Sequence, residues 1–135
     1  MKSLARNQRA YKLVTGWSGS VLKNAVDLAQ GYPIELRTSG TMQTLAFSMG
    51  KAEPGHAAMA QAIADWVLSS ESGAPLGVVA DKERNARKLL QLLAEASVAQ
   101  YVAADGESIA FADTIKIIGK AIIKITGQAG AGNGG

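Results

Sequence analysis

Apolar residues recur along most of the chain at intervals of three and four, the period of an amphipathic helix. Residues 2–30 give one long predicted helix, which Gly16 and Gly19 interrupt, so we expect a bend near Trp17. The run Gln30-Gly31-Tyr32-Pro33 ends it, because Gly suits the C-terminal cap and Pro cannot continue a helix. The apolar face predicted for this helix consists of Leu4, Tyr11, Val14, Val21, Ala25 and Leu28.

The same period predicts five further helical segments, at residues 34–49, 56–70, 82–95, 97–104 and 107–125. Asp81 and Ser97 are the expected N-caps of two of them, and Asp105-Gly106 is an expected turn or kink. We therefore predict an all-α fold, a single-domain helical bundle of about five or six helices over residues 1–126. Residues 127–135 read G-Q-A-G-A-G-N-G-G, a composition typical of a flexible tail.

The central stretch Ile34–Phe47 places the polar run Arg37-Thr38-Ser39-Gly40 inside an apolar frame. Gly costs about 1 kcal/mol relative to Ala in a helix interior. Gly40 therefore indicates a helix boundary or a close approach of another backbone. Two interpretations stay open here. One is a buried helix with a tight crossing, and the other is a site where Arg37, the hydroxyls and the Gly40 backbone meet a phosphate or a partner chain.

Composition narrows the class of protein. Apolar residues make up 47% of the chain and charged residues 19%, ordinary values for a soluble globular domain. The chain has no cysteine, which excludes disulfides, thiolate catalysis and cysteine-based zinc sites and suits a reducing cytosol. No apolar h-region follows the first basic residues, and no run of eighteen apolar residues occurs. We therefore expect neither a signal peptide nor a membrane span.

The charge is distributed unevenly along the chain. Residues 53–113 hold four basic groups and nine acids, whereas residues 114–135 hold three lysines and no acid. Residues 1–30 hold five basic groups and one acid. If the two ends pack together, the molecule has one positive side, although each basic stripe can equally be a solvated helix face. The candidate nucleic-acid-binding residues of that side are Arg9, Lys12, Lys23, Arg37, Lys116, Lys120 and Lys124.

Signals for catalysis are weak. The sequence contains no G-x-S-x-G, P-loop or H-E-x-x-H motif. His56 is the one histidine, and its place at a predicted helix start favours a solvated terminal residue over a metal ligand. We expect no catalytic residue, no metal and no cofactor.

The run R-T-S-G-T-M-Q-T-L-A-F resembles the R-(T/S)-(N/S)-G-L-x-Q-T-L-A-F-L segment of the small α-helical subunit of type III-B (Cmr) CRISPR–Cas effector complexes. It departs from that segment at Thr41 and Ser48, where the family usually carries Leu. The order of elements over residues 4–125 also resembles the family, whereas the stretch 115–118 departs from its usual Trp-Leu-Lys. The matching residues are Arg37, Gly40, Gln43, Thr44, Leu45, Ala46 and Phe47.

The resemblance implies a cytoplasmic, non-catalytic, RNA-binding structural subunit in antiviral defence. Copies would stack head to tail as the inner filament, beside the other Cmr effector subunits that hold CRISPR RNA and cleave target RNA. The basic residues would line the channel for the target strand, and Gly40, Gln43, Thr44, Leu45 and Phe47 would serve packing. Two alternatives stay open: the small subunit of a type III-A complex, and a cationic protein that binds membrane surfaces through its Ile-rich C-terminal helix.

Overall fold

The computed structural model describes residues 1–127, which form six α-helices and two short 3₁₀-helices and contain no strand. The predicted all-α bundle is therefore confirmed for this part of the chain. The predicted flexible tail lies, apart from Gly127, outside the described residues. In chain order the elements are α1 (Lys2–Gly16), α2 (Gly19–Ala29), α3 (Tyr32–Met49), α4 (Pro54–Val67), η1 (Ser70–Ser72), η2 (Asp81–Glu83), α5 (Ala86–Ala94) and α6 (Val98–Thr126).

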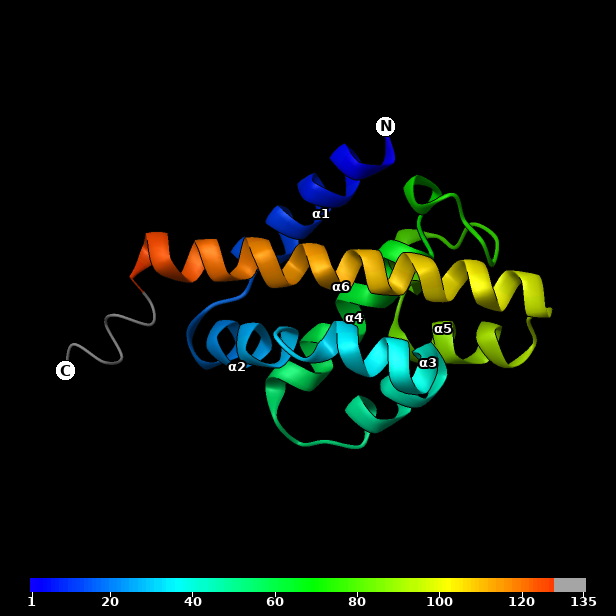
Figure 1. Ribbon diagram of the computed structural model, residues 1–135, viewed down its shortest axis with the longest axis horizontal. Coiled ribbons are helices and arrows are strands. Elements are labelled where there is room, and N and C mark those ends of the chain that lie inside the picture. The colour runs from blue at the N-terminus through cyan, green and yellow to red at the C-terminus, as the bar shows by residue number, and fades with distance from the viewer. Residues whose placement is uncertain (128–135) are drawn as a thin grey trace.

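The long helix α6 runs along the whole molecule, and the other helices are arranged around it (Figure 1). In this view α1 extends from one flank of α6, whereas α2 and α3 lie on the opposite flank. Helix α4 passes behind α6 and packs against α2, α3 and α5. The arrangement gives α6 one long side in the core and leaves its outer side to solvent.

The core is centred on the contact between α4 and α6. Met59, Ile63 and Trp66 of α4 are fully buried, as are Phe111 and Ile115 of α6. The Trp66 and Phe111 rings stack with centroids 5.2 Å apart and an interplanar angle of 5°. Aromatic pairs in such parallel contact contribute beyond the area they bury, so this stack fixes how α4 crosses α6.

The first predicted helix is broken rather than bent. Trp17 and Ser18 adopt extended backbone conformations, and α2 starts afresh at Gly19 with a φ of 57°. The apolar face predicted for the first half is only partly right: Val14 is buried as predicted, but Leu4 and Tyr11 are 52% and 56% exposed. Helix α1 is rotated so that Ala10 is buried together with Val14. The basic side chains of α1 account for this rotation, as described below.

Two later boundaries also differ from the predictions. Asp81 begins only the short η2, and Asn85 caps α5 by accepting a hydrogen bond from the Lys88 amide at 2.8 Å. The segments predicted as 97–104 and 107–125 form one continuous helix, which Ser97 begins with a capping box as expected. Asp105 does not turn the chain, because its carboxylate binds α3.

Gly40 interrupts α3 with a φ of 83° and a ψ of 164°, which divides the helix into two halves. The first amides of the second half bond to α6: the Thr41 amide donates to Asp105 Oδ1 at 2.9 Å and the Met42 amide to the Tyr101 hydroxyl at 3.1 Å. The Thr41 hydroxyl also bonds to Asp105. The predicted boundary and the tight crossing are thus both present, and these amides are not open to a phosphate. We call this contact the α3–α6 clamp.

Replacing Gly40 by Ala should weaken the α3–α6 clamp. A β-carbon there would lie 3.2 Å from the Tyr101 hydroxyl. The alanine would also have to keep the positive φ of 83°, which residues with a side chain rarely adopt. We expect the free energy of unfolding to fall by about 1–3 kcal/mol, measured by urea denaturation. Gly106→Ala is the matched control, because Gly106 lies within α6 with open space around it. That variant should gain up to about 1 kcal/mol, and a similar loss in both variants would contradict the clamp.

Candidate nucleic-acid interface

Lys116, Lys120 and Lys124 lie on one face of α6, because a spacing of four residues returns to nearly the same side of a helix. Asp113 falls on that face too, and Arg37 of α3 donates a hydrogen bond to it, with Nη2 3.0 Å from Oδ2. Arg37 therefore stands at the N-terminal end of the lysines. We call Arg37, Lys116, Lys120 and Lys124 the α6 basic row. Lys120 and Lys124 are exposed and Lys116 is half-buried.

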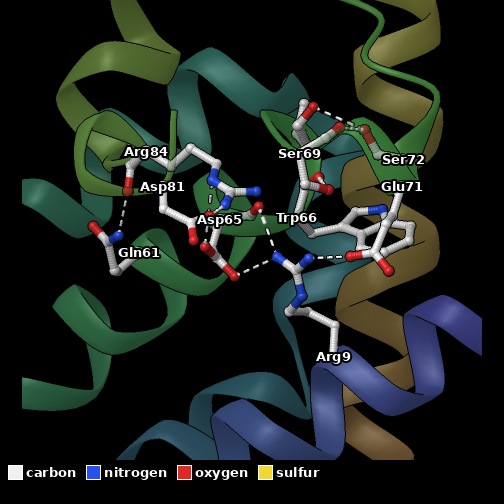
Figure 2. Close-up of polar contacts among 10 residues, drawn as sticks. Arg9, Gln61, Asp65, Trp66, Ser69, Glu71, Ser72, Asp81 and Arg84 are labelled. Carbon is white, nitrogen blue, oxygen red and sulfur yellow. Dashed lines mark hydrogen bonds and ion pairs between the residues drawn. The ribbon is translucent and has the colours of Figure 1, made fainter. Parts of the chain in front are cut away.

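Arg9 lies elsewhere, in a partly buried ion-pair cluster (Figure 2). Its Nη1 atom is 2.7 Å from Asp65 Oδ2 on α4, and its Nη2 atom bonds to Glu71. Burial alone would lower the pKa of Arg9, but the hydrogen bonds and charges of Asp65 and Glu71 outweigh it and raise that pKa above its ordinary value. The Arg9 guanidinium is therefore held as a structural cation.

The cluster extends in both directions from Arg9. Arg84 pairs with Asp81 and approaches Asp65, with Nε 3.9 Å from Oδ1 (Figure 2). On the α6 side, Glu107 accepts a hydrogen bond from Trp66 Nε1 at 2.9 Å. Glu107 also pairs with Lys2 at 2.9 Å and lies 3.6 Å from Arg6 Nε.

These contacts correct the expectation that the basic residues of the first helix form an outward stripe. Lys2, Arg6 and Arg9 turn toward acids of α4, η1 and α6. Lys12 is exposed on the side of α1 opposite its buried residues, and Lys23 is exposed on α2. Neither lysine forms an ion pair among residues 1–127. The structure thus brings together four of the seven predicted residues, those of the α6 basic row, and places Arg9 away from them.

The motif residues divide between the core and a groove. Leu45 is fully buried, and Gly40 belongs to the α3–α6 clamp. Gln43, Thr44 and Phe47 instead line a groove of about 820 Å³ formed by α2, α3 and the start of α4. Phe47 is 60% exposed, so its expected packing role is not in the core.

His56 lies at the same groove and is buried, which corrects the prediction of a solvated terminal residue. Its Nδ1 atom is 3.2 Å from the Ser48 hydroxyl, which in turn is 2.8 Å from the Tyr32 hydroxyl. Burial is the main cause that raises the pKa of Tyr32, and the Ser48 hydrogen bond opposes it. These three side chains tie the start of α4 to both ends of α3.

Residues 1–127 contain no group of three or more His, Asp or Glu side chains placed to hold a metal ion. None of the helices in this region is both long and apolar enough to cross a membrane.

Comparison with known families gives one match. The family model described as CRISPR-associated protein (Cas_Cmr5) matches residues 2–122. The chain belongs to the Cas_Cmr5 family. No curated protein and no solved structure shows significant similarity to it. The resemblance inferred from the R-T-S-G-T-M-Q-T-L-A-F motif is confirmed, and the chain is a CRISPR-associated subunit of the Cmr type.

The Cas_Cmr5 match begins at residue 2 and therefore includes the whole ion-pair cluster. Sequence reasoning missed this cluster, because it treated the basic residues of α1 only as a surface. Arg9 and Lys2 pair with acids more than fifty residues away, and such pairing leaves no pattern in the local sequence. Asp113, which anchors Arg37, was missed for the same reason.

Arg9→Met should destabilise the fold, because it leaves Asp65 and Glu71 facing α1 without their cation. We expect a loss of about 1–3 kcal/mol in the free energy of unfolding, between the values for exposed and buried ion pairs. Lys12→Met is the matched control on the same helix and should change it by less than about 0.5 kcal/mol. Urea denaturation of both variants measures the difference in the free energy of unfolding. Equal values would mean that the ion pairs of Arg9 do not stabilise the fold.

Proposed function

We propose that the chain is a non-catalytic RNA-binding structural subunit of a type III-B CRISPR RNA-guided effector complex, acting in the cytoplasm in antiviral defence. Copies of it stack head to tail beside the subunits that hold CRISPR RNA, next to the duplex of guide and target. Membership of the Cas_Cmr5 family supports the complex. The α6 basic row is the observation that supports RNA binding.

The geometry of the row suits a nucleic-acid backbone. From Lys116 to Lys124 the helix rises roughly 12 Å, at 1.5 Å per residue. Successive phosphates of one strand are close enough for the three lysines to contact neighbouring phosphates. Lysines bind phosphates as point charges and fix position without reading sequence. This is the role needed where base pairing with a guide already supplies the specificity.

Arg37 can join the lysines at low cost. Its partner Asp113 has a side chain 43% exposed, and Arg37 itself is 54% exposed. An exposed ion pair of this kind contributes only about 0–1 kcal/mol. A phosphate that approaches the row can therefore replace Asp113 as the partner of the guanidinium.

The two alternatives to this function are less well supported. A helix that binds a membrane surface needs a free apolar face, but Ile115 is buried and Ile118 and Ile122 pack against the core. Only Ile117 and Ile125 remain exposed on the C-terminal half of α6. The small subunit of a type III-A complex is disfavoured by the match to a Cmr family.

The purified chain should cleave neither RNA nor DNA with any divalent metal ion. Residues 1–127 offer no cluster of carboxylates and histidine to position a metal and its activated water. Incubation of labelled RNA and DNA with Mg²⁺ or Mn²⁺, followed by gel analysis, measures this. Turnover that disappears when one carboxylate is replaced would overturn the non-catalytic assignment.

Replacing Lys116, Lys120 and Lys124 together by Ala should weaken binding of target RNA by the reconstituted complex. Each lost phosphate contact with a single strand removes about 0.7 from the slope of log affinity against log salt, so the slope should flatten by about 2 per subunit. The fold should persist, because exposed Lys→Ala changes usually alter stability by less than about 0.5 kcal/mol. Filter binding over a range of salt concentrations measures both quantities.

The control for this experiment removes the same charge from another helix. Lys82, Arg87 and Lys88 lie at η2 and α5, and their triple replacement by Ala should leave affinity and salt slope unchanged. Equal effects of the two triple variants would mean that only net charge matters. If the slope of log affinity against log salt is unchanged in the α6 variant, its lysines do not contact RNA and are only solvated.

A further inference from the structure

The groove beside α3 has a chemistry unlike that of the α6 basic row. Its floor and walls include Leu28, Ala46 and the exposed ring of Phe47. Asp27 and Glu35 stand on it, and neither carboxylate has an ion-pair partner within residues 1–127. Such a surface repels a phosphate backbone. It suits an apolar segment that carries a positive charge.

The ring of Phe47 at the groove has two neighbours within its own chain. Lys51 Nζ lies over the Phe47 ring, 4.5 Å from its centroid, and the His56 ring meets the same ring edge-on at 5.9 Å. Phe47 is thus held in place from two sides while most of its surface stays open. An exposed aromatic ring that is fixed in this way loses little conformational entropy when a partner covers it.

The opposite flank of the molecule carries a matching ridge. Leu4 and Tyr11 lie two turns apart on α1, and both are more than half exposed. Lys12 follows Tyr11 and is the one basic residue of α1 without an ion-pair partner among residues 1–127, since Lys2, Arg6 and Arg9 turn inward. We call Leu4, Tyr11 and Lys12 the α1 ridge. The ridge presents apolar side chains that can pack on the apolar part of the groove. It also presents one positive charge that can pair with the carboxylates of the groove.

The ridge and the groove of one molecule cannot meet, because α1 and α3 lie on opposite flanks of α6 (Figure 1). The two flanks are fixed by contacts on opposite sides of α6: Glu107 faces α1, whereas Tyr101 and Asp105 face α3. A contact between ridge and groove therefore joins two copies. It is heterologous, because each copy offers a different face, and such contacts repeat in one direction along a stack.

We propose that the groove is the docking site for the α1 ridge of a second copy of this chain. Tyr11 and Leu4 cover Phe47 and Leu28, and Lys12 pairs with Glu35 and Asp27. The inference rests on the stacking part of the proposed function and names its two faces. It leaves the α6 basic row free for RNA. Three side chains carry the contact on the α1 side, so we expect a weak pairwise contact and stacking that depends on repeated copies and on the other subunits.

Cysteine cross-linking tests the assignment, since the chain contains no natural cysteine. Lys12→Cys and Glu35→Cys variants of the full chain are mixed at high concentration, and also assembled together into the complex, under mild oxidation. The mixture should yield disulfide-linked dimers at least about tenfold above either variant alone, because the contact raises the effective concentration of the two thiols. The double variant Lys12→Cys with Glu35→Cys should yield a ladder of oligomers.

Matched variants identify the contact. Tyr11→Ser or Phe47→Ser in the cysteine background should reduce the cross-linked yield to the collision level given by Lys82→Cys mixed with Glu35→Cys. Val98→Ser, which removes an 82% exposed apolar side chain at the start of α6, should leave the yield unchanged. Circular dichroism confirms that each variant keeps its helices.

The outcomes separate this inference from the proposed function. Dimers from Lys12→Cys alone, or a yield at the collision level in both the free chain and the complex, would overturn the assignment of ridge and groove. If the complex still contains several copies and binds RNA through the α6 basic row, stacking occurs through other faces. A ladder together with unchanged RNA binding by the triple lysine variant would support the contact and refute the RNA surface.

Discussion

The packing of α1 depends on the pairing of its basic side chains with acids that the chain supplies much later. Arg9 pairs with Asp65, and Lys2 pairs with Glu107. The Trp66 ring stacks on Phe111, and its indole N–H donates a hydrogen bond to Glu107. One side of Trp66 therefore belongs to the apolar core and its indole N–H to the ionic cluster. Packing of α4 on α6 places the acids, and the acids determine which face α1 turns inward.

This dependence explains where sequence reasoning succeeded and where it failed. The helical conformation of α3, α4 and α6 was predicted correctly, because apolar residues recur there at intervals of three and four over many residues. In helix α1 the prediction was right for Val14 but wrong for Leu4 and Tyr11, because three basic residues of the helix turn toward distant acids and expose these two side chains. Two boundaries were also wrong. Asp81 was predicted as the N-cap of the helix that Asn85 caps, and its carboxylate instead pairs with Arg84. Asp105-Gly106 was predicted to interrupt the chain, but Asp105 binds α3 from within a continuous helix.

For the candidate site, the lysine spacing on α6 could be predicted, but the division of the positive charge could not. Pairing within the molecule engages the guanidinium of Arg9 and the ammonium of Lys2, whereas the three lysines on the C-terminal half of α6 form no ion pair among residues 1–127. The acids of the groove are left unpaired on another face. The net charge of +3 for the whole chain therefore does not describe the basic surface of α6 or the acidic groove.

The unbroken course of α6 has a mechanical consequence. Asp105 and Tyr101 fix the helix to the start of the second half of α3. Lys120 follows Asp105 by fifteen residues, roughly 22 Å along a straight axis. Sliding α6 by one turn would move it about 5.4 Å and separate Asp105 from both amide and hydroxyl of Thr41. Because α6 is unbroken, the clamp beside Gly40 fixes the position of the lysines along the helix axis. The break that Gly40 makes within the family motif of α3 would in this way set where the positive charges of α6 lie.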